Sequence, residues 1–503
     1  MNAVYLVLAL YFAVLFGIGL AARSRVVDME DYLVGGKRLG YWVVAFSARA
    51  TGESAWLLLG LTGLGAMVGV SALWVVAGEV LGVAGAWLLM ARPFKNLTDR
   101  YGSVTIPDFL VSHFDDGSPR SARLTRRVRI LAAGALAIFV TIYVSAQIDA
   151  TGKAFEDFLS WDYYTGILVG FAIVVAYTFA GGFVAVAWSD LFQGSIMALG
   201  LVLVPVVAFF SLPDGSGLVS ELASIDPGLA SPWGPEGATL TGFLLIISYL
   251  AIGLGFLGSP QVFVRFMSLG SADQLRQGRW VAILYTLITD TGAVLTGMLG
   301  RYLLVPGGQD VESVLGVAAE GVLPAIVDFL FPALIVGIFI AAVLSAIMST
   351  IDSLLVVASS AVTRDYYQQL RHPDIDHGRM TRLSRIATLA MALTALSISL
   401  VVSLVSPDRT IFWFVIFGWS GIAATFCPAI ILTLSWKGYR VEGVLASMIV
   451  GFLSIPFFKF AVPAFGPSGE NFALVGEMAP SFATALIAGW IASRLADARH
   501  GKS

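Results

Sequence analysis

Residues 41–68 read YWVVAFSARATGESAWLLLGLTGLGAMV, and this stretch decides how the chain folds. Both ends are apolar, as in a membrane-spanning helix, but the centre, residues 47–56, reads SARATGESAW. A charged side chain at the bilayer centre costs about 2.5–3.5 kcal/mol, so such residues are rare and usually functional. Arg49 and Glu53 therefore predict a functional site on a helix that is interrupted inside the membrane.

The composition predicts an all-α polytopic membrane protein. The chain has 503 residues, of which 57% are hydrophobic and only 13% charged, whereas soluble domains are about one quarter charged. The single cysteine, Cys427, excludes a disulfide framework and a thiolate metal site. The composition does not support nucleic-acid binding, and the partners we expect are the lipid bilayer and a small-molecule solute, with no obligatory protein partner.

Apolar windows of about 20 residues mark membrane spans. The first window lacks a basic region before it and is too long for a signal-peptide core, so we expect it to be retained. The sequence predicts thirteen spans, near residues 3–22, 41–69, 71–91, 130–148, 163–181, 191–211, 239–259, 280–300, 329–362, 386–405, 410–435, 443–463 and 472–493.

The distribution of Lys and Arg predicts the orientation, because these residues stay cytoplasmic in short loops. With the N-terminus outside and the C-terminus cytoplasmic, most of them fall in the cytoplasmic segments, Arg265 among them. Lys153, Arg301 and Arg409 fall outside, and Arg49 and Lys459 fall within spans. The external loop 212–238 agrees, because it carries four acidic residues (Asp214, Glu221, Asp226 and Glu236) and no basic one.

A second interrupted helix is predicted where residues 253–260 read GLGFLGSP, since three glycines and a proline weaken a helix. The two interrupted spans lie five spans apart, and paired interruptions at matching positions mark the binding site of an inverted-repeat transporter. We expect repeats at 41–211 (spans 2–6) and 239–435 (spans 7–11). Residues 1–40 would form the first span and a cytoplasmic loop, and residues 436–503 two further spans and a cytoplasmic tail.

The ninth span carries the chemistry of an ion site, because residues 346–353 read AIMSTIDS. Hard cations prefer oxygen ligands, so the hydroxyls here and the carbonyls freed by the interrupted helix suit sodium. Alternatively, the hydroxyls bond back to their own helix or hold two helices together.

Several motifs resemble those of the sodium solute symporter family, and among its members the chain is most similar to the sodium/proline symporters. The motifs are DYLVGGK at 31–37, WLLLG at 56–60, TFAGGF at 178–183 with WSD at 188–190, RFM at 265–267, and MST at 348–350 followed by SSA at 359–361.

This resemblance implies a LeuT-like 5+5 inverted-repeat bundle that imports a solute with sodium by alternating access in the cell (inner) membrane. Its sodium ligands would be the carbonyls of Ala50, Glu53 and Ala346 and the hydroxyls of Ser349 and Thr350. A further sodium would lie at Asp190 with Ser349, Asp352 and Ser353; alternatively, Asp190 caps a helix that begins at Leu191. The solute positions would be Ser54, Ala55, Tyr143, Ile252, Phe256 and Pro260.

Three positions depart from the proline-symporter pattern, which has an aspartate, a tryptophan and a tyrosine where this chain has Gly52, Ile252 and Phe256. A site that discriminates through polar groups is sensitive to their loss. L-Proline is the leading solute, and another amino acid or a small organic acid is the alternative.

Arg49 and Glu53 are four residues apart, so on a helix they would share a face and neutralise each other. Alternatively, Arg49 binds a substrate carboxylate directly. Glu79 and Asp290 also lie in apolar spans, where we expect them to face the interior of the bundle, without an assigned partner.

Other function classes are less well supported. An enzyme would need a nucleophile with its base or a metal site, but His113, His372, His377 and His500 all lie outside the predicted spans. A channel or a solute sensor is the distant alternative, although paired interrupted helices with a closed cation site suit a carrier better.

Overall fold

A computed structural model describes residues 2–23, 25, 29–178, 182–212, 217–372 and 374–500, and the long elements in this part of the chain are all helices. Its only β-type pairing is an isolated bridge between Leu39 and Leu269. The 179–181 part of the TFAGGF motif and Asp214 of the external loop lie outside the described residues.

The first half of the chain forms eleven α-helices. They are α1 (Asn2–Arg23), α2 (Met29–Val34), α3 (Tyr41–Gly52), α4 (Thr62–Val68), α5 (Leu73–Gly85), α6 (Ala91–Tyr101), α7 (Ile106–Phe114), α8 (Pro119–Leu159), α9 (Tyr163–Thr178), α10 (Gly182–Phe209) and α11 (Leu218–Ile225).

Twelve more α-helices follow in the second half. They are α12 (Leu240–Ala251), α13 (Pro260–Ser268), α14 (Leu275–Leu304), α15 (Val311–Leu315), α16 (Val322–Leu330), α17 (Ala333–Ser360), α18 (Gln369–Arg371), α19 (His377–Val405), α20 (Ile411–Ser435), α21 (Val441–Pro456), α22 (Pro467–Ala473) and α23 (Met478–His500).

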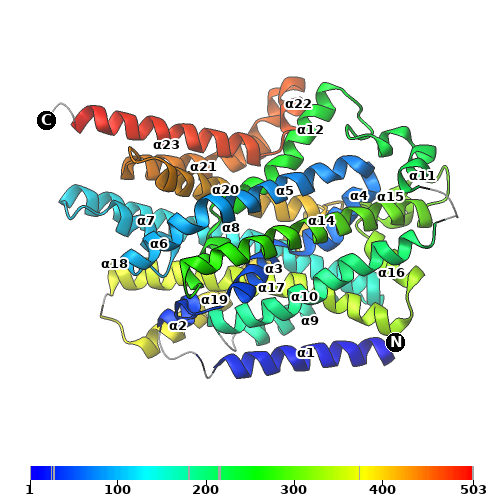
Figure 1. Ribbon diagram of the computed structural model, residues 1–503, viewed down its shortest axis with the longest axis horizontal. Coiled ribbons are helices and arrows are strands. Elements are labelled where there is room, and N and C mark those ends of the chain that lie inside the picture. Colours follow the sequence, from blue (N-terminus) through cyan, green and yellow to red (C-terminus); the bar gives the residue numbers. More distant parts are fainter. Residues whose placement is uncertain are drawn as a thin grey trace.

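The long helices run side by side along one direction (Figure 1). Ten helical runs in the described residues are long and apolar enough to cross a membrane, or eleven if α22 and α23, which meet at an 89° bend, form one span. The predicted spans 41–69 and 71–91 meet at Gly69, whose φ of +59° and ψ of −130° are not helical, and helical segments lie on both sides of it between Trp56 and Tyr101. The predicted span 163–181 corresponds to a shorter apolar helix, Tyr163–Ala176.

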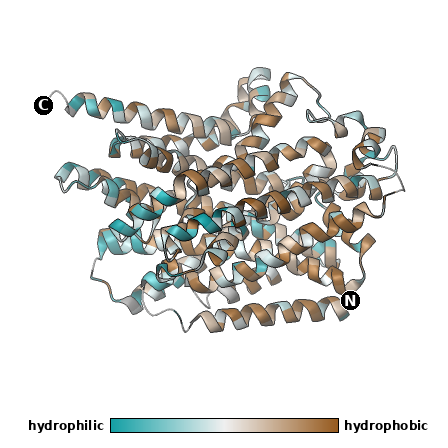
Figure 2. Cartoon of the chain, in the orientation of Figure 1, coloured by the Kyte–Doolittle hydropathy of each residue, from teal (hydrophilic) through white to brown (hydrophobic). Residues whose placement is uncertain are grey.

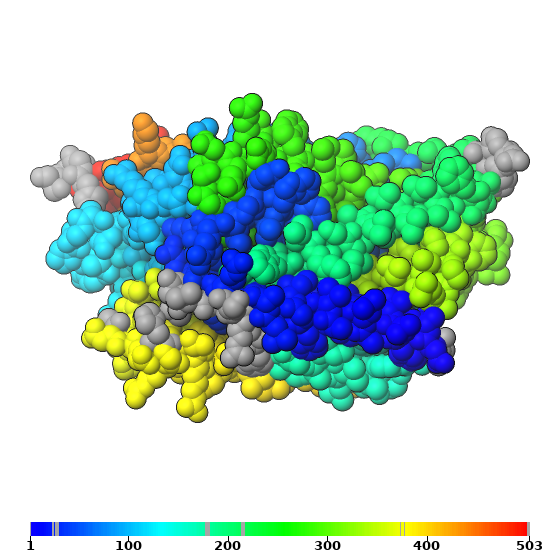
Figure 3. All heavy atoms as spheres, turned by 60° about the horizontal axis from the view of Figure 1, so that its bottom comes forward, coloured from blue at the N-terminus to red at the C-terminus, as the bar shows by residue number. Residues whose placement is uncertain are grey.

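Polar residues gather at the end of the bundle that holds α2, α6 and α18 (Figure 2). This is the end at which the sequence places cytoplasmic basic segments. α1 lies on the outside of the bundle (Figure 3), and many of its side chains are exposed. Its buried Tyr11 hydroxyl lies 3.1 Å from Nε2 of Gln193 on α10 and 3.0 Å from Oγ of Ser345 on α17.

Both predicted helix interruptions are present. α3 ends at Gly52, Glu53 is extended (φ −95°, ψ 106°), and the helix resumes as the π-helical segment Trp56–Leu61. In the second interruption, α12 gives way to the 3-10 segment Ile252–Leu257, and α13 begins at Pro260 after Gly258, whose φ is +152°.

Glycines allow the second interruption to lie against α5. A Cβ atom added to Gly253 would lie 1.8 Å from the carbonyl oxygen of Gly78, and one added to Gly82 would lie 2.0 Å from the carbonyl oxygen of Gly253. Neither distance is compatible with a side chain. The backbones of α5 and the 3-10 segment therefore touch directly, as small residues permit in membrane bundles.

Candidate functional site

The interruption after α3 is held open by a side chain from α8. Gln147 accepts a hydrogen bond from the Ala55 backbone N–H at 3.1 Å through Oε1, and its Nε2 donates to Ser54 Oγ at 3.0 Å. The Trp56 indole donates to the Gly52 carbonyl at 3.1 Å. Backbone groups that the helix leaves unpaired must find partners inside a membrane protein. Sequence reasoning missed Gln147, a lone amide in an apolar span.

Two of the predicted sodium ligands, Ser349 and Thr350, face backbone carbonyls of α3 where α17 crosses this interruption. Ser349 Oγ is 3.0 Å from the Ala50 carbonyl oxygen and 3.2 Å from that of Ala346, its own helix neighbour. Thr350 Oγ1 is 3.4 Å from the carbonyl oxygen of Thr51, which the sequence did not single out. All five predicted ligands, including Glu53, are buried. The donor set consists of oxygens only, which fits a hard monovalent cation.

Asp190 lies within α10 and not at a helix start, so the interpretation of Asp190 as a cap for a helix beginning at Leu191 is wrong. Its Oδ2 accepts hydrogen bonds from Ser47 Oγ at 2.5 Å and from Arg265 Nη2 at 3.2 Å. The same Arg265 nitrogen lies 2.5 Å from Oγ of Ser353. Oδ1 of Asp190 and both carboxylate oxygens of Asp352 have no hydrogen-bond partner within the described part of the chain.

Arg265 was expected in a cytoplasmic loop, and this prediction is wrong. It lies in α13 and is only 1% exposed. The reason is that α13 continues for nine residues beyond the interruption, inside the protein, so a window of 20 apolar residues ends before the helix does. A guanidinium thus already occupies one side of the predicted second sodium position.

Three of the six predicted solute positions contact Trp419 of α20, which sequence reasoning did not select, and a fourth, Ser54, lies beside one of them. The Trp419 ring centroid is 5.0 Å from that of Phe256 and 6.4 Å from that of Tyr143, and its indole donates to the Ile252 carbonyl at 3.0 Å. Tyr143 OH lies 3.4 Å from Oγ of Ser54. A tryptophan in mid-span is unusual, because this residue favours membrane interfaces, and that signal could have identified it.

The other two predicted solute positions are placed differently. Ala55 is buried directly at the interruption. Pro260 starts α13 and lines a separate small cavity with Leu136, Val264 and Asp365.

Arg49 is engaged in ion pairs. Its Nη2 lies 2.5 Å from Oε1 of Glu53 and 3.3 Å from Oε2 of Glu79, and the guanidinium carbon lies 4.6 Å from the centre of the Phe256 ring. The predicted structural pairing of Arg49 with Glu53 is therefore present, and Glu79 now has a partner. Of the three guanidinium nitrogens of Arg49, Nη1 is the one without a hydrogen-bond partner in the described residues.

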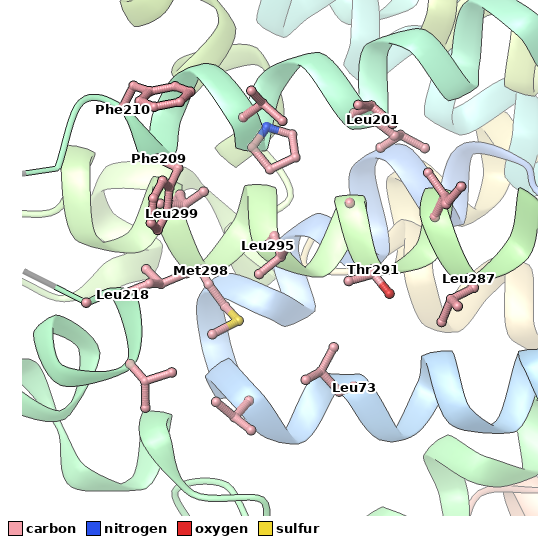
Figure 4. Close-up of a pocket in the computed structure, with 18 of the residues that line it drawn as sticks. Leu73, Leu201, Phe209, Phe210, Leu218, Leu287, Thr291, Leu295, Met298 and Leu299 are labelled. Atoms are coloured by element: carbon pink, nitrogen blue, oxygen red, sulfur yellow. The ribbon is translucent and has the colours of Figure 1, made fainter. Parts of the chain in front are cut away.

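A larger apolar cavity of about 1160 Å³ lies elsewhere, between α10, α14 and the start of α5 (Figure 4). Leu73, Leu201, Phe209 and Met298 are among the residues that line it. None of the predicted sodium or solute residues does, so this cavity is separate from the candidate site.

The family model for the sodium:solute symporter family matches residues 32–451. The chain belongs to this family. It is 35% identical to the high-affinity proline transporter PutP of Bacillus subtilis over 96% of both chains, and 34% identical to the osmoregulated proline transporter OpuE of the same organism over 97% of this chain and 94% of that one. It is 30% identical to a sodium/proline symporter of Staphylococcus aureus, over 98% of this chain and 92% of that one.

Two solved transporter structures share the helical fold of this chain. A substrate-bound, outward-open Na⁺-coupled sialic acid symporter superposes with a TM-score of 0.78 at 19% identity, over 98% of this chain and 97% of that one. Mhp1, a nucleobase-cation-symport-1 family transporter in a closed conformation, gives a TM-score of 0.51 at 13% identity, over 93% of this chain and 95% of that one. The protein is a multi-pass membrane protein and a symporter of the sodium:solute symporter family, in which solute transport is coupled to sodium.

Proposed function

We propose that this symporter imports L-proline together with sodium across the cell membrane by alternating access. Sodium coupling is supported by the contact between the Ser349 hydroxyl of α17 and the Ala50 carbonyl of α3. This contact brings the adjacent hydroxyls of Ser349 and Thr350 to the interrupted helix. Proline is supported by the names of the relatives, which are 30–35% identical over nearly the whole chain.

The proposed sodium site consists of Ala50, Glu53, Ala346, Ser349 and Thr350, with Glu53 contributing its backbone carbonyl. Sodium bound there would tie α3 to α17 by replacing weak hydroxyl–carbonyl contacts of 3.0–3.4 Å with ion–oxygen contacts. One sodium moving down 100 mV supplies about 2.3 kcal/mol, which is enough to concentrate a solute roughly fiftyfold.

The proposed architecture is a LeuT-like 5+5 inverted repeat with thirteen spans, an external N-terminus and a cytoplasmic C-terminus. Three additions bring the ten long apolar runs to thirteen spans. The first is α3 with its continuation to Val68, counted apart from α5; the second is α9; the third is α22 together with α23. The polar end of the bundle, with α2, α6 and α18, would face the cytoplasm (Figure 2).

A different small solute is favoured by one feature, the chemistry around Phe256. This ring has no hydroxyl, and it packs between the Arg49 guanidinium and Trp419. A pocket without that phenol discriminates less by hydrogen bonding, so another amino acid or a small organic acid is the second candidate.

A thermal-shift screen of the purified protein separates these candidates. Proline should raise the unfolding temperature in sodium buffer and leave it unchanged in choline buffer, because ligands stabilise only the state they bind. Sodium-dependent proline counterflow in proteoliposomes would then demonstrate a carrier rather than a channel, because a channel exchanges no bound solute. Stabilisation by other amino acids or organic acids but not by proline would refute proline as the solute.

The second sodium proposed at Asp190, Asp352 and Ser353 has its own test. Asp190→Asn removes the charge while keeping the shape, so we expect the apparent affinity for sodium to fall in solute-uptake assays. An unchanged sodium dependence would show that Asp190 serves only to hold Arg265.

A further inference from the structure

A basic cavity of about 680 Å³ lies at the polar end of the bundle, where the chain turns from α18 into α19 (Figure 2). Its lining includes Arg371 of α18, Arg379 and Arg382 of α19, and Asp374 of the connecting loop. Among the described residues the lining thus has three guanidinium groups and one carboxylate, so it is positively charged even when His372 is neutral. This segment, yellow in Figure 3, lies at the surface of the molecule.

The turn that forms the cavity is fixed by local contacts. The His372 backbone N–H donates to the Tyr367 carbonyl at 3.1 Å, and the centres of these two rings are 4.7 Å apart. The Asp376 carboxylate accepts hydrogen bonds from the backbone N–H groups of Gly378 and Arg379, at 3.0 and 3.3 Å, and so caps the start of α19. Asp376 therefore satisfies the helix start and forms no ion pair with any described arginine.

The three arginines of the cavity are not engaged by acidic side chains. All three are exposed, and none forms an ion pair within the described part of the chain. Arg129, by contrast, is held by Asp108 at 2.6 Å and by Asp365 at 2.9 Å. A guanidinium presents five N–H donors in a planar fork that matches the oxygens of a phosphate. The cavity is therefore suited to a phosphate group.

The face of α19 that lines the cavity changes from basic to apolar along the helix. Residues 379, 382, 383 and 386 are spaced i, i+3, i+4 and i+7, so they share one face. The same face continues through Leu389 and Leu393, and Ile386, Leu389 and Leu393 are 55%, 37% and 47% exposed. Because α19 is long and apolar enough to cross a membrane, these exposed side chains contact lipid tails.

The dimensions of this face match those of one leaflet. A helix rises 1.5 Å per residue, so Arg382 and Ile386 lie about 6 Å apart along the axis. The polar region of one leaflet is about 5–8 Å thick, since a bilayer of about 40–45 Å has a hydrocarbon core of about 30 Å. A phosphate held by Arg379 and Arg382 would therefore place its acyl chains beside Ile386 and the leucines that follow.

We propose that this cavity binds an anionic phospholipid, with the phosphate held by Arg371, Arg379 and Arg382 and an acyl chain lying along α19. Basic pockets between membrane helices recognise anionic headgroups in this way. The lipid comes from the cytoplasmic leaflet, given the orientation proposed above. A soluble phosphate would use the same arginines but would gain nothing from the apolar face. The site is separate from the proposed sodium and solute sites, because none of their residues lines it.

Thermal unfolding of the purified full-length protein in detergent tests the proposal. Phosphatidylglycerol, added in steps, should raise the unfolding temperature. Phosphatidylcholine at the same concentrations should not, because its headgroup carries no net charge. Replacing the three arginines of the cavity together (Arg371→Gln, Arg379→Gln and Arg382→Gln) should weaken phosphatidylglycerol binding about a hundredfold. Each basic residue near a membrane surface contributes about fivefold, which corresponds to about 1 kcal/mol.

The matched control removes three arginines from the start of α8, through Arg123→Gln, Arg126→Gln and Arg127→Gln. These residues are exposed, belong to another segment that the sequence places in the cytoplasm, and do not line the cavity. The control variant should keep the wild-type response to phosphatidylglycerol. Since all six side chains are exposed, both triple variants should fold. The single variant Arg382→Gln, with binding weakened about fivefold, is a second measurement that does not depend on the triple variant.

Several results would overturn the proposal. No stabilisation by phosphatidylglycerol, or equal stabilisation by both lipids, would show that the protein does not select an anionic headgroup. An equal loss of the phosphatidylglycerol effect in the control variant would show that the charge of the whole surface attracts the lipid. Stabilisation by inorganic phosphate to the same extent as by the lipid would identify a site for a soluble anion. None of these measurements requires sodium, solute or transport, so failure here leaves the proposed function standing.

Discussion

Ser349→Ala is the sharpest test of the proposed sodium site. The Ser349 hydroxyl is one of five proposed oxygens, and it lies 3.0 Å and 3.2 Å from two of the others, the carbonyls of Ala50 and Ala346. Removing one polar partner from a buried site costs about 1–2 kcal/mol. This corresponds to a roughly 5- to 30-fold loss of sodium affinity, with little change in the maximal uptake rate at saturating sodium.

Two assays measure this loss. Solute uptake into proteoliposomes, followed over a range of sodium concentrations, gives the apparent affinity for sodium. Thermal unfolding in detergent, with sodium replaced stepwise by choline, gives the same quantity without transport, because stabilisation grows with the ratio of ligand concentration to Kd. The two measurements should shift by the same factor.

Ser345→Ala is the matched control, one helical turn earlier on α17. Ser345 is also fully buried, and its hydroxyl donates to the Tyr11 hydroxyl at 3.0 Å, so the control loses a comparable hydrogen bond. It should lower the unfolding temperature without changing the sodium dependence. If both variants keep the wild-type sodium affinity, or both lose it equally, Ser349 is not a sodium ligand.

Two other substitutions test the packing around the site. Gly253→Ala should destabilise the protein by about 3 kcal/mol or more in a thermal-unfolding assay, because its Cβ would lie 1.8 Å from the Gly78 carbonyl oxygen. The control is Gly134→Ala, which has open space around it and should be neutral or stabilising in the same assay. Trp419→Phe removes the indole that donates to the Ile252 carbonyl, so we expect a KM for solute several-fold higher with kcat nearly unchanged, and an unchanged KM would exclude Trp419 from the pocket.

The interruptions were predictable because their causes are local. Polar residues at 47–54 and glycines with a proline at 253–260 disrupt a helix wherever it lies, and the structure breaks at both places. Ser349 and Thr350 were identifiable for a similar reason, since two adjacent hydroxyls in an apolar helix are visible in the sequence itself.

The residues that sequence reasoning missed depend on which helices meet. Gln147 and Trp419 are single side chains in apolar spans, and their roles arise only because α8 and α20 pack against the two interruptions. Arg265 was missed for a different reason, since hydropathy places the end of a span by length and cannot show that α13 continues inside the protein.

Gly52 and Phe256, two of the positions that depart from the proline-symporter pattern, lie against each other in the structure. A Cβ atom at Gly52 would lie 2.6 Å from the Phe256 ring and 3.7 Å from Arg49 Nη1, so the ring occupies the space that an acid at position 52 would need. The acid stands at position 53 instead, where the extended backbone directs its side chain to Arg49 and to Thr289 of α14. In this chain the acidic side chain therefore lies beside Arg49 and Thr289. An aspartate at position 52 requires the Phe256 ring to shift, so we expect Gly52→Asp to lower the unfolding temperature, and an unchanged unfolding temperature would show that the ring moves freely.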